Sequence, residues 1–439
     1  MNFNIDQQSL DELNLLGKFR QGSVYHLFNQ VKTRGGEKLL DEMFRQPLIH
    51  ETVINQRTAI FHFFQCLGLK FPFSVQQVGL MREYLDTGAG KGLIATFAGT
   101  LAMKLLSLTV RDERYKTNIQ GLQATIEVLK SCHNFISTIG VTSDSAFAAR
   151  IQEIKDLLYT PRLEKLRNTD IYKALSVQTL VHYDLLLKTH HHEDMENMLS
   201  FIHEVDVYIA VSSVAATRGF VYAKALTGAC NMLSVKELRH PAIENAVGNS
   251  LTMNEASNML FLTGANMAGK STLMKSLGIS LYLAHIGFPV AAASMDFSVR
   301  EGLYTSINVA DNIHLGYSHF YAEVVRVKQA AEAASQGKRL LLMFDELFKG
   351  TNVKDAYDGT LSVTEAFAEY RDCLFVVSTH IIEVGEALRG HDNILFRYLP
   401  TVMEGGRPRY TYRLEEGITE DRQGMMIIRN EGILEMIHS

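Results

Sequence analysis

The chain has 439 residues, of which 46% are hydrophobic and 21% are charged. These proportions are typical of a globular protein and leave room for about two to four domains. The formal net charge of −5 excludes a protein that binds nucleic acid through overall positive charge, but not one that binds it along a single face. We expect no membrane span, because no apolar run reaches about 18 residues. The N-terminus lacks signal-peptide features and the four cysteines are scattered, so we expect a cytoplasmic protein.

The first half of the chain is predicted to be mostly helical. Apolar residues recur at spacings of three and four in residues 119–139 and 147–158. Residues 8–46 are predicted to be helical with a turn at Gly35-Gly36, and residues 51–66 to form the next helix. These helices could form either a bundle or an arm, and the pattern alone leaves both open.

The pattern changes near residue 225. Residues 207–225 are small and apolar and predict a tightly packed helix. From Leu233 onward, short apolar runs alternate with helical stretches, which is typical of an α/β domain. We therefore expect a helical region over residues 1–225 and an α/β domain over residues 226–439.

The strongest signal is a phosphate-binding loop. Met259–Leu262 predict a short buried strand, and residues 271–285 an amphipathic helix. Between them lies Gly264-x-x-x-x-Gly269-Lys270-Ser271. Glycines let successive backbone N–H groups face a phosphate, and the helix N-terminus adds positive potential. We expect Lys270 to reach the β- and γ-phosphates of a nucleotide and Ser271 to hold Mg²⁺.

Two later strands end in residues suited to nucleotide hydrolysis. The apolar run 340–344 leads into Asp345-Glu346, where Asp345 is predicted to bind Mg²⁺ and Glu346 to deprotonate the attacking water. A third buried strand, residues 373–378, precedes His380, which could position that water or sense the γ-phosphate. Parallel strands that end at one sheet edge would bring these side chains around one crevice.

A helix of about residues 318–334 is predicted between these motifs, opening with Ser318. A serine at this position is by default an N-cap. Alternatively, its hydroxyl and the helix N-terminus face a phosphate, which a second subunit could hold. The local sequence does not separate the two interpretations.

These motifs resemble those of the MutS family of DNA mismatch-repair ATPases. The resemblance covers both ends of the chain. In the C-terminal half it rests on the phosphate loop Thr263–Thr272, the acidic block Asp345–Asn352 with Asp358-Gly359, the strand-end segment Ser378-Thr379-His380, the domain entry Arg239-His240-Pro241 with Glu244, and the short element Phe288–Ala291. In the N-terminal half it rests on the segment from Gly22-Ser23 to Arg57.

The resemblance implies an ABC-type P-loop ATPase domain that follows a helical core and lever region. It implies ATP and Mg²⁺ as cofactors, a homodimer with composite ATP sites, and DNA as a partner. Ser318 would then face the partner's γ-phosphate, Asn266 would contact the γ-phosphate of its own site, and Tyr412 could stack on the adenine. The nucleotide would contact the loop residues Gly264, Ala265, Asn266, Met267, Ala268, Gly269, Lys270, Ser271 and Thr272.

The chain also departs from the family pattern. It begins at the core, so we expect neither the N-terminal mismatch-reading domain nor the connector. Residues 352–357 are longer than the usual stretch before Asp-Gly, and Tyr317 and His319 replace the family's usual arginine and threonine. We expect a DNA-binding ATPase of repair or recombination without wedge-type mismatch reading. The alternatives are an ATP-gated protein-interaction module that has lost DNA binding and the ATPase subunit of a transporter, which the long helical half disfavours.

Overall fold

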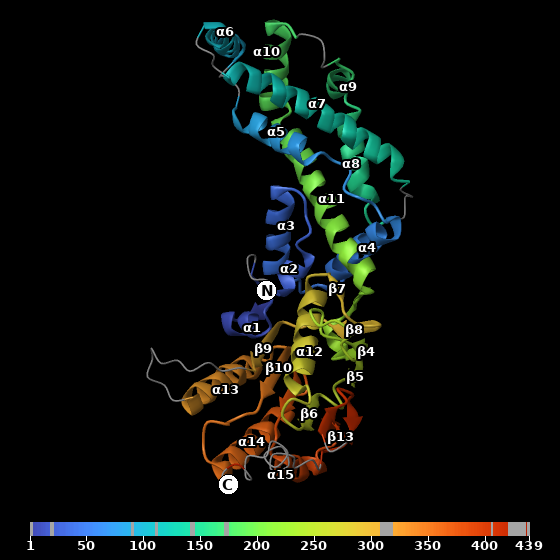
Figure 1. The fold of residues 1–439 in the computed structure, drawn as a ribbon, viewed down its shortest axis with the longest axis vertical. Helices are drawn as coiled ribbons and strands as arrows, with labels where there is room; N and C mark the ends of the chain where they lie inside the picture. Colours follow the sequence, from blue (N-terminus) through green and yellow to red (C-terminus); the bar gives the residue numbers. More distant parts are fainter. Residues whose placement is uncertain are drawn as a thin grey trace. The chain divides into compact units, whose positions relative to one another are not determined.

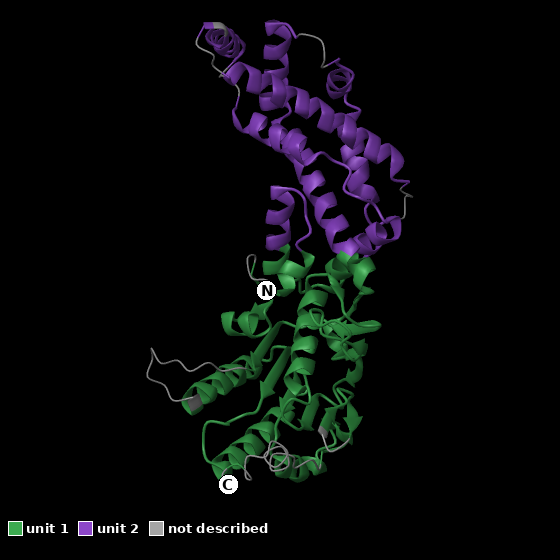
Figure 2. Cartoon of the chain, in the orientation of Figure 1, with its two compact units in different colours: residues 1–28, 43–58, 214–439 green, residues 29–42, 59–213 purple. Residues whose placement is uncertain are grey.

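The computed structural model describes residues 3–17, 22–88, 92–109, 113–140, 145–170, 175–307, 319–404, 407–419 and 436 (Figure 1). The chain packs into two compact units (Figure 2). Unit 1 comprises residues 1–28, 43–58 and 214–439, and unit 2 comprises residues 29–42 and 59–213. Segments from the start of the chain thus pack with its C-terminal half.

The centre of unit 1 is a seven-stranded sheet. All neighbouring strands run parallel except β12 and β15, which are antiparallel. The spatial order is β1 (Asn4–Ile5), β9 (Gly302–Ser306), β10 (Leu340–Asp345), β11 (Leu374–Ser378), β6 (Met259–Gly264), β12 (Ile394–Leu399) and β15 (Glu415–Glu416). Every residue of β6 and β11 is buried, as expected for parallel strands covered on both faces.

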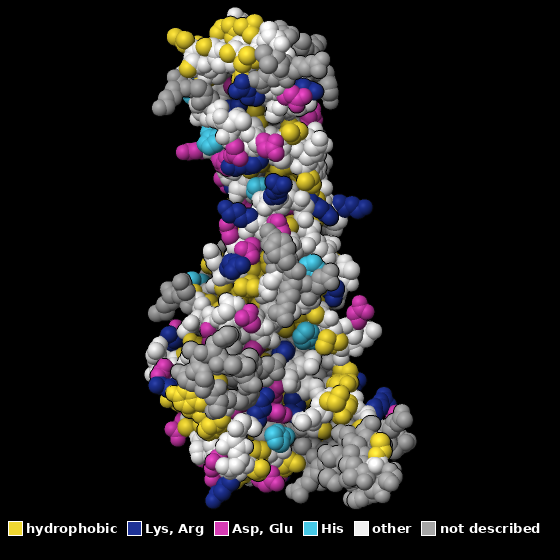
Figure 3. Space-filling model, turned by 60° about the vertical axis from the view of Figure 1, so that its left-hand side comes forward, with side chains coloured by type: hydrophobic (Ala, Val, Ile, Leu, Met, Phe, Trp, Pro, Cys, Tyr) yellow, Lys and Arg dark blue, Asp and Glu magenta, His cyan; other side chains and the backbone are white. Residues whose placement is uncertain are grey.

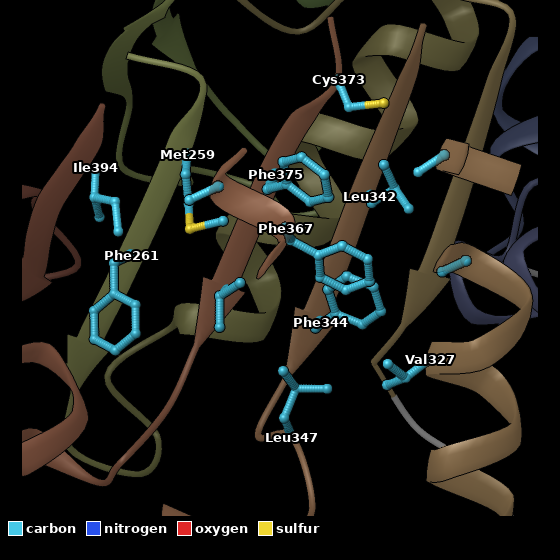
Figure 4. Close-up of a cluster of buried hydrophobic side chains, with 14 of the residues drawn as sticks. Met259, Phe261, Val327, Leu342, Phe344, Leu347, Phe367, Cys373, Phe375 and Ile394 are labelled. Atoms are coloured by element: carbon cyan, nitrogen blue, oxygen red, sulfur yellow. The ribbon is translucent and has the colours of Figure 1, made fainter. Parts of the chain in front are cut away.

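Helices cover both faces of this sheet. On one face, α13 (His319–Ser335), α14 (Val353–Ala368) and α15 (Ile382–Ala387) pack over a cluster of buried side chains (Figure 4). In this cluster the ring of Phe367 stacks on Phe344 and Phe375, with centroids 5.3 and 5.1 Å away. On the other face lies α12 (Lys270–His285), where Gly278 lies directly against Met343. Met343 and Phe344 point to opposite faces because side chains alternate along a strand.

Smaller elements complete unit 1. A four-stranded sheet has the order β3 (Lys224–Leu226), β8 (Ser294–Ser298), β4 (Leu233–Leu238) and β5 (Asn249–Met253). Two strand pairs are β2 (Val221–Tyr222) with β7 (Pro289–Val290), and β13 (Thr401–Glu404) with β14 (Arg407–Tyr410). The short helices are α1 (Gln7–Glu12), α2 (Val24–Phe28), η2 (Gly228–Cys230) and η4 (Leu388–Gly390).

Unit 2 is helical throughout the part that the structure describes. Its helices, three of which also extend into unit 1, are α3 (Arg34–Arg45), α4 (Glu51–Leu67), α5 (Val75–Asp86), α6 (Leu93–Thr109), α7 (Arg114–Thr138), α8 (Ala148–Leu158), α9 (Pro161–Arg167), α10 (Val177–Leu185), the π-helix η1 (Leu186–His190) and α11 (His192–Arg218). Aromatic rings pack in the core of unit 2. Phe64 of α4 stacks on Tyr208 of α11, and Phe147, the N-cap residue of α8, stacks on Phe201 of α11.

The turn predicted at Gly35-Gly36 is wrong. Both glycines lie in the first turn of α3, which Thr33 caps by accepting a hydrogen bond from the Gly36 N–H at 2.9 Å. A Cβ on Gly35 would lie 2.0 Å from the ring of His203, and one on Gly36 would lie 2.5 Å from the carboxylate of Asp206. These glycines therefore permit the close approach of α3 and α11 rather than a turn.

The helix predicted over residues 207–225 ends early. α11 stops at Arg218, and Val221 and Lys224 begin two short strands. By length and composition α11 could cross a membrane, but 72% of its most apolar window is buried inside the protein. The core helix of a water-soluble protein meets the same criteria, so this helix is weak evidence for a membrane span.

Candidate nucleotide-binding site

The phosphate-loop sequence forms the connection between β6 and α12. Gly264 and Gly269 adopt left-handed φ values of 146° and 103°, a region that favours glycine. A Cβ on Gly264 would lie 3.1 Å from the carbonyl oxygen of Leu399. Gly269 directly precedes α12, so the free N–H groups of the first helical turn face the loop. The glycine spacing in the sequence therefore has a direct conformational cause.

Lys270 turns back over this loop. Its Nζ donates hydrogen bonds to the carbonyl oxygens of Gly264 at 2.8 Å and Ala265 at 3.2 Å. The residue is only 5% exposed. Burial lowers the pKa of Lys270, and the carboxylates of Glu346 and Asp345 oppose that shift. The ammonium group is thus held beside two carboxylates in a partly desolvated place, where an anion would be attracted strongly.

Asp345, at the end of β10, joins three elements. Its two carboxylate oxygens accept hydrogen bonds from the hydroxyls of Ser271, at the start of α12, and Ser378, at the end of β11. The strands β10, β11 and β6, which leads into α12, are parallel and end at the same sheet edge. Residues distant in sequence therefore meet here. The result is a cluster of hydroxyl and carboxylate oxygens beside the phosphate loop.

Glu346 and His380 lie next to this cluster. The backbone N–H of Glu346 bonds to the Ser378 carbonyl at 2.9 Å, and its side-chain Oε1 lies 3.7 Å from Nδ1 of His380. The interaction with His380 lowers the pKa of Glu346, partly opposed by burial. The same interaction raises the pKa of His380. The two side chains therefore form an ion pair at mildly acidic pH.

Lys270, Ser271, Asp345 and Glu346 line a hollow of about 320 Å³, and His380 contacts Glu346 without being part of that lining. Polar groups from the loop, from the end of β10 and from the segment after it converge there. Its lining comprises Ala265, Asn266, Met267, Gly269, Lys270, Ser271, Thr272, Ile307, Asp345, Glu346 and Lys349. Ile307 and Lys349 were not among the predicted site residues: Ile307 belongs to no motif, and Lys349 lies in the Asp345–Asn352 block without a predicted role.

A second hollow, of about 540 Å³, lies on the other side of the loop. It shares Met267, Gly269 and Thr272 with the first hollow and also contains Ala268 and Tyr412. Apolar and polar residues from several segments complete it: Leu238, His240, Ile243, Asn245, Ala246, Val247, Asn249, Leu273, Ser276 and Leu399.

Tyr412 is held at this hollow by its backbone. Asn249 donates a 2.9 Å hydrogen bond to the Tyr412 carbonyl and accepts one from the Leu414 N–H. The sequence analysis pointed to this region through Tyr412, the phosphate loop and the Arg239-His240-Pro241 motif, but it missed Asn249 and its neighbours. Ser318 lies outside the described residues, so its predicted place beside a phosphate stays a prediction.

Comparison with known proteins identifies the family. The sequence profile of MutS domain V, the ATPase domain of that family, matches residues 260–438. Residues 260–438 therefore belong to the MutS domain V family. Curated relatives, each named DNA mismatch repair protein MutS, include those of Streptococcus thermophilus (23% identical over 68% of this chain), Streptococcus mutans (23% over 82%) and Lactobacillus delbrueckii (26% over 84%).

The matched relatives are much longer proteins. The alignments cover 36%, 43% and 44% of those three sequences, so this chain spans less than half their length. The profile match begins inside β6 and includes the phosphate loop, Asp345-Glu346 and His380. The match therefore covers every lining residue of the first hollow, but not residues 238–249 of the second.

Proposed function

We propose that this chain is a DNA-binding ATPase that binds and hydrolyses ATP with Mg²⁺ and couples the nucleotide state to DNA binding. The observation that carries the proposal is that Lys270, Ser271, Asp345 and Glu346 line one hollow at the carboxyl ends of three parallel strands, with His380 3.7 Å from Glu346. Such edges are where open α/β sheets bind ligands. An ABC-type P-loop arrangement of residues 226–439, preceded by a helical core and lever over residues 1–225, is part of this proposal.

The two hollows suit the two ends of a nucleotide. Phosphates would occupy the smaller one, where the loop N–H groups, Lys270 and Asn266 supply donors. The base would occupy the larger, more apolar hollow, where Tyr412 could stack on it. The shared lining residues Met267, Gly269 and Thr272 lie where the two parts of the ligand would join.

The residues present also suit Mg²⁺. This ion prefers oxygen ligands and usually keeps several waters. Ser271 and Asp345 already lie within hydrogen-bonding reach of each other, so a small movement would direct both oxygens at one ion. When bound, Mg²⁺ would neutralise charge on the phosphate oxygens.

Hydrolysis would depend on Glu346 and His380. The lowered pKa of Glu346 keeps its carboxylate ionised at neutral pH, as a residue that orients and deprotonates water requires. His380 lies beside it and would orient that water or contact the γ-phosphate. Lys270 would exchange its bonds to the loop carbonyls for bonds to phosphate oxygens.

DNA binding, a cytoplasmic location and a homodimer with composite ATP sites complete the proposal. The names of the relatives support a role in DNA repair. In a composite dimer Ser318 of one subunit would contact the nucleotide held by the other. Whether this chain reads mismatches is left to experiment.

The test is steady-state ATP hydrolysis by the purified chain, alone and with duplex, mismatched, single-stranded and branched DNA. We expect Lys270→Ala to abolish nucleotide binding and Glu346→Gln to retain binding but lower turnover by about 100-fold or more. Turnover that both variants leave intact would refute the site assignment.

DNA binding requires its own measurement. We expect affinity for the preferred DNA to fall as salt rises, since phosphate contacts release counterions. Hydrolysis that ignores every DNA, together with salt-independent or absent binding, would favour the ATP-gated protein-interaction module instead.

A further inference from the structure

Helix α6 in unit 2 exposes an apolar surface. Within its sequence, Leu93–Thr109, Lys104 is the single charged residue. Hydrophobic side chains gather at the top of Figure 3, where this helix lies. The exposed large side chains are Leu93 (65%), Ile94 (86%), Phe97 (39%), Leu101 (40%), Leu105 (55%) and Leu106 (37%).

The inner face of α6 carries smaller and more polar residues, Ala95, Thr96, Gly99 and Thr100, together with Met103. Among its residues whose side chains the structure describes, Thr96 and Thr100 are the buried ones. Their hydroxyls bond to carbonyl oxygens of their own helix, of Gly92 and Thr96, at 3.0 and 2.8 Å. They line a cavity of about 500 Å³ in unit 2. The usual orientation of a surface helix, apolar inward and polar outward, is thus reversed.

The exposed apolar area is large enough to bind a partner. At about 150 Å² or more for a large side chain, the exposed fractions amount to roughly 500 Å² per chain, near the largest patches on monomeric proteins. Two such patches in contact would bury less than about 1,000 Å², because Leu93 and Leu106 would flank the contact, and this is the size of a weak and reversible interface.

We propose that α6 pairs with α6 of a second copy of this chain, antiparallel and about a two-fold axis. In one antiparallel register Ile94 faces Leu105 on the centre line of the contact, while Leu93 and Leu106, about 140° apart around the helix, flank it. In the same register the large Phe97 and Leu101 face the small Ala102 and Ala98. This alternation of large and small side chains makes the stripe complementary to itself, as a two-fold interface requires.

Charge favours the same occupant. In the antiparallel register Lys104 faces Ala95 of the other copy, whereas a parallel pair would place the two lysines together. A helix that lies on a lipid surface carries many basic residues beside its apolar face, and α6 carries one. The pairing lies in unit 2 and requires no nucleotide, so it is independent of the proposed ATPase function.

The test begins with the mass of the nucleotide-free chain, measured by light scattering and sedimentation over a range of concentrations. We expect a reversible dimer whose dissociation constant rises at least tenfold in Leu101→Glu. Val402→Glu, at a similarly exposed residue (42%) of β13, should leave the dimer unchanged. A monomer at all concentrations, or a dimer insensitive to Leu101→Glu, would overturn the proposal.

Cross-linking tests the register without a disruptive substitution. In a chain with Cys66 and Cys230 changed to serine, we expect Ala98→Cys and Leu101→Cys proteins to cross-link with each other far more than either does with itself. Equal cross-linking in all mixtures would contradict the antiparallel register. Binding to vesicles of phosphatidylcholine and phosphatidylglycerol that is lost in Leu101→Glu would assign the patch to a lipid surface and refute the pairing.

Discussion

Two residues that follow Asp345 have a left-handed backbone conformation, which is unusual for residues other than glycine. Glu346 and Phe348, neither of them glycine, have φ values of 57° and 60°. Such conformations cost roughly 1–3 kcal/mol each and persist where the surroundings hold them. Here the Glu346 N–H bonds to the Ser378 carbonyl, and the Phe348 ring packs on Phe320 of α13. The strain directs the Glu346 side chain toward His380 and the hollow.

The Glu346–His380 pair predicts a pH dependence of stability. The folded pKa of Glu346 lies below 4.5 and that of His380 above 6.5. The pair is therefore fully charged between about pH 4.5 and 6.5. Its stabilisation is lost as pH rises through the pKa of His380 and as pH falls through that of Glu346. The histidine is 57% exposed, so the effect stays below about 1 kcal/mol.

We expect the difference in melting temperature between the unmodified chain and His380→Gln to be largest near pH 5.5–6. It should shrink steadily toward pH 8. His62→Gln, an exposed histidine of α4, is the comparison at each pH. A difference that grows from pH 6 to pH 8 would contradict the ion pair.

A buried charge network in unit 2 makes a second prediction at this scale. Nζ of Lys188 bonds to Thr87 and Asn118 at 2.9 and 3.0 Å and lies 3.7 Å from the carboxylate of Asp184. Tyr84 also donates to Asp184. Lys188→Met would leave this carboxylate without its cation, so we expect a loss of about 3 kcal/mol of unfolding free energy in urea. Adding Asp184→Asn should recover part of the loss, and purely additive effects would argue against coupling.

At the scale of whole elements, the contact of α3 with α11 depends on glycine. The same contact includes Asp206 of α11, which accepts hydrogen bonds from the Lys32 and Thr33 backbone N–H groups and from the Thr33 hydroxyl. Only a residue without a side chain at Gly35 leaves room for the His203 ring. The carboxylate of Asp206 thus links the two helices, and the lack of a side chain at Gly35 lets them approach each other closely.

Gly35→Ala is expected to destabilise the chain by about 1–3 kcal/mol, because its methyl group would force His203 or the helix to move. The matched control is Gly79→Ala in α5, where a Cβ meets nothing within 4 Å. That change should be neutral or slightly stabilising, since alanine favours helix. Denaturant unfolding of both variants measures the difference, and equal stabilities would show that the packing does not require glycine.

At the scale of the whole molecule, the two proposed functional surfaces lie in different units. Every described residue of the candidate site belongs to unit 1, whereas the apolar α6 belongs to unit 2. A ligand that binds only the folded protein stabilises it by about 2.7 kcal/mol at 100 times its dissociation constant. ATP should therefore stabilise unit 1 directly.

We expect Mg²⁺-ATP to raise the temperature of a calorimetric transition that Lys270→Ala no longer shifts. Leu101→Glu, at the exposed face of α6, should keep the full shift. A shift that survives in Lys270→Ala would place the nucleotide elsewhere and contradict the proposed site.

The candidate site was largely predictable because its signals are local. The spacing of Gly264, Gly269, Lys270 and Ser271 is imposed by one turn between a strand and a helix, so it is visible without any long-range contact. The strands before Asp345 and His380 were recognisable as apolar runs ended by polar residues. Parallel pairing then placed the ends together, as expected.

Long-range packing decided the rest. Gly35-Gly36 looked like a turn because local sequence cannot reveal that His203 and Asp206 of a distant helix lie against them. The second hollow draws residues from β4, α12 and the segment of Tyr412, which no spacing connects. Periodicity predicts that the apolar face of a surface helix is buried, so only the tertiary structure shows that the apolar side of α6 faces outward. The backbone geometry of one turn thus determined the spacing of the phosphate-loop motif, whereas tertiary contacts determined which residues surround the loop.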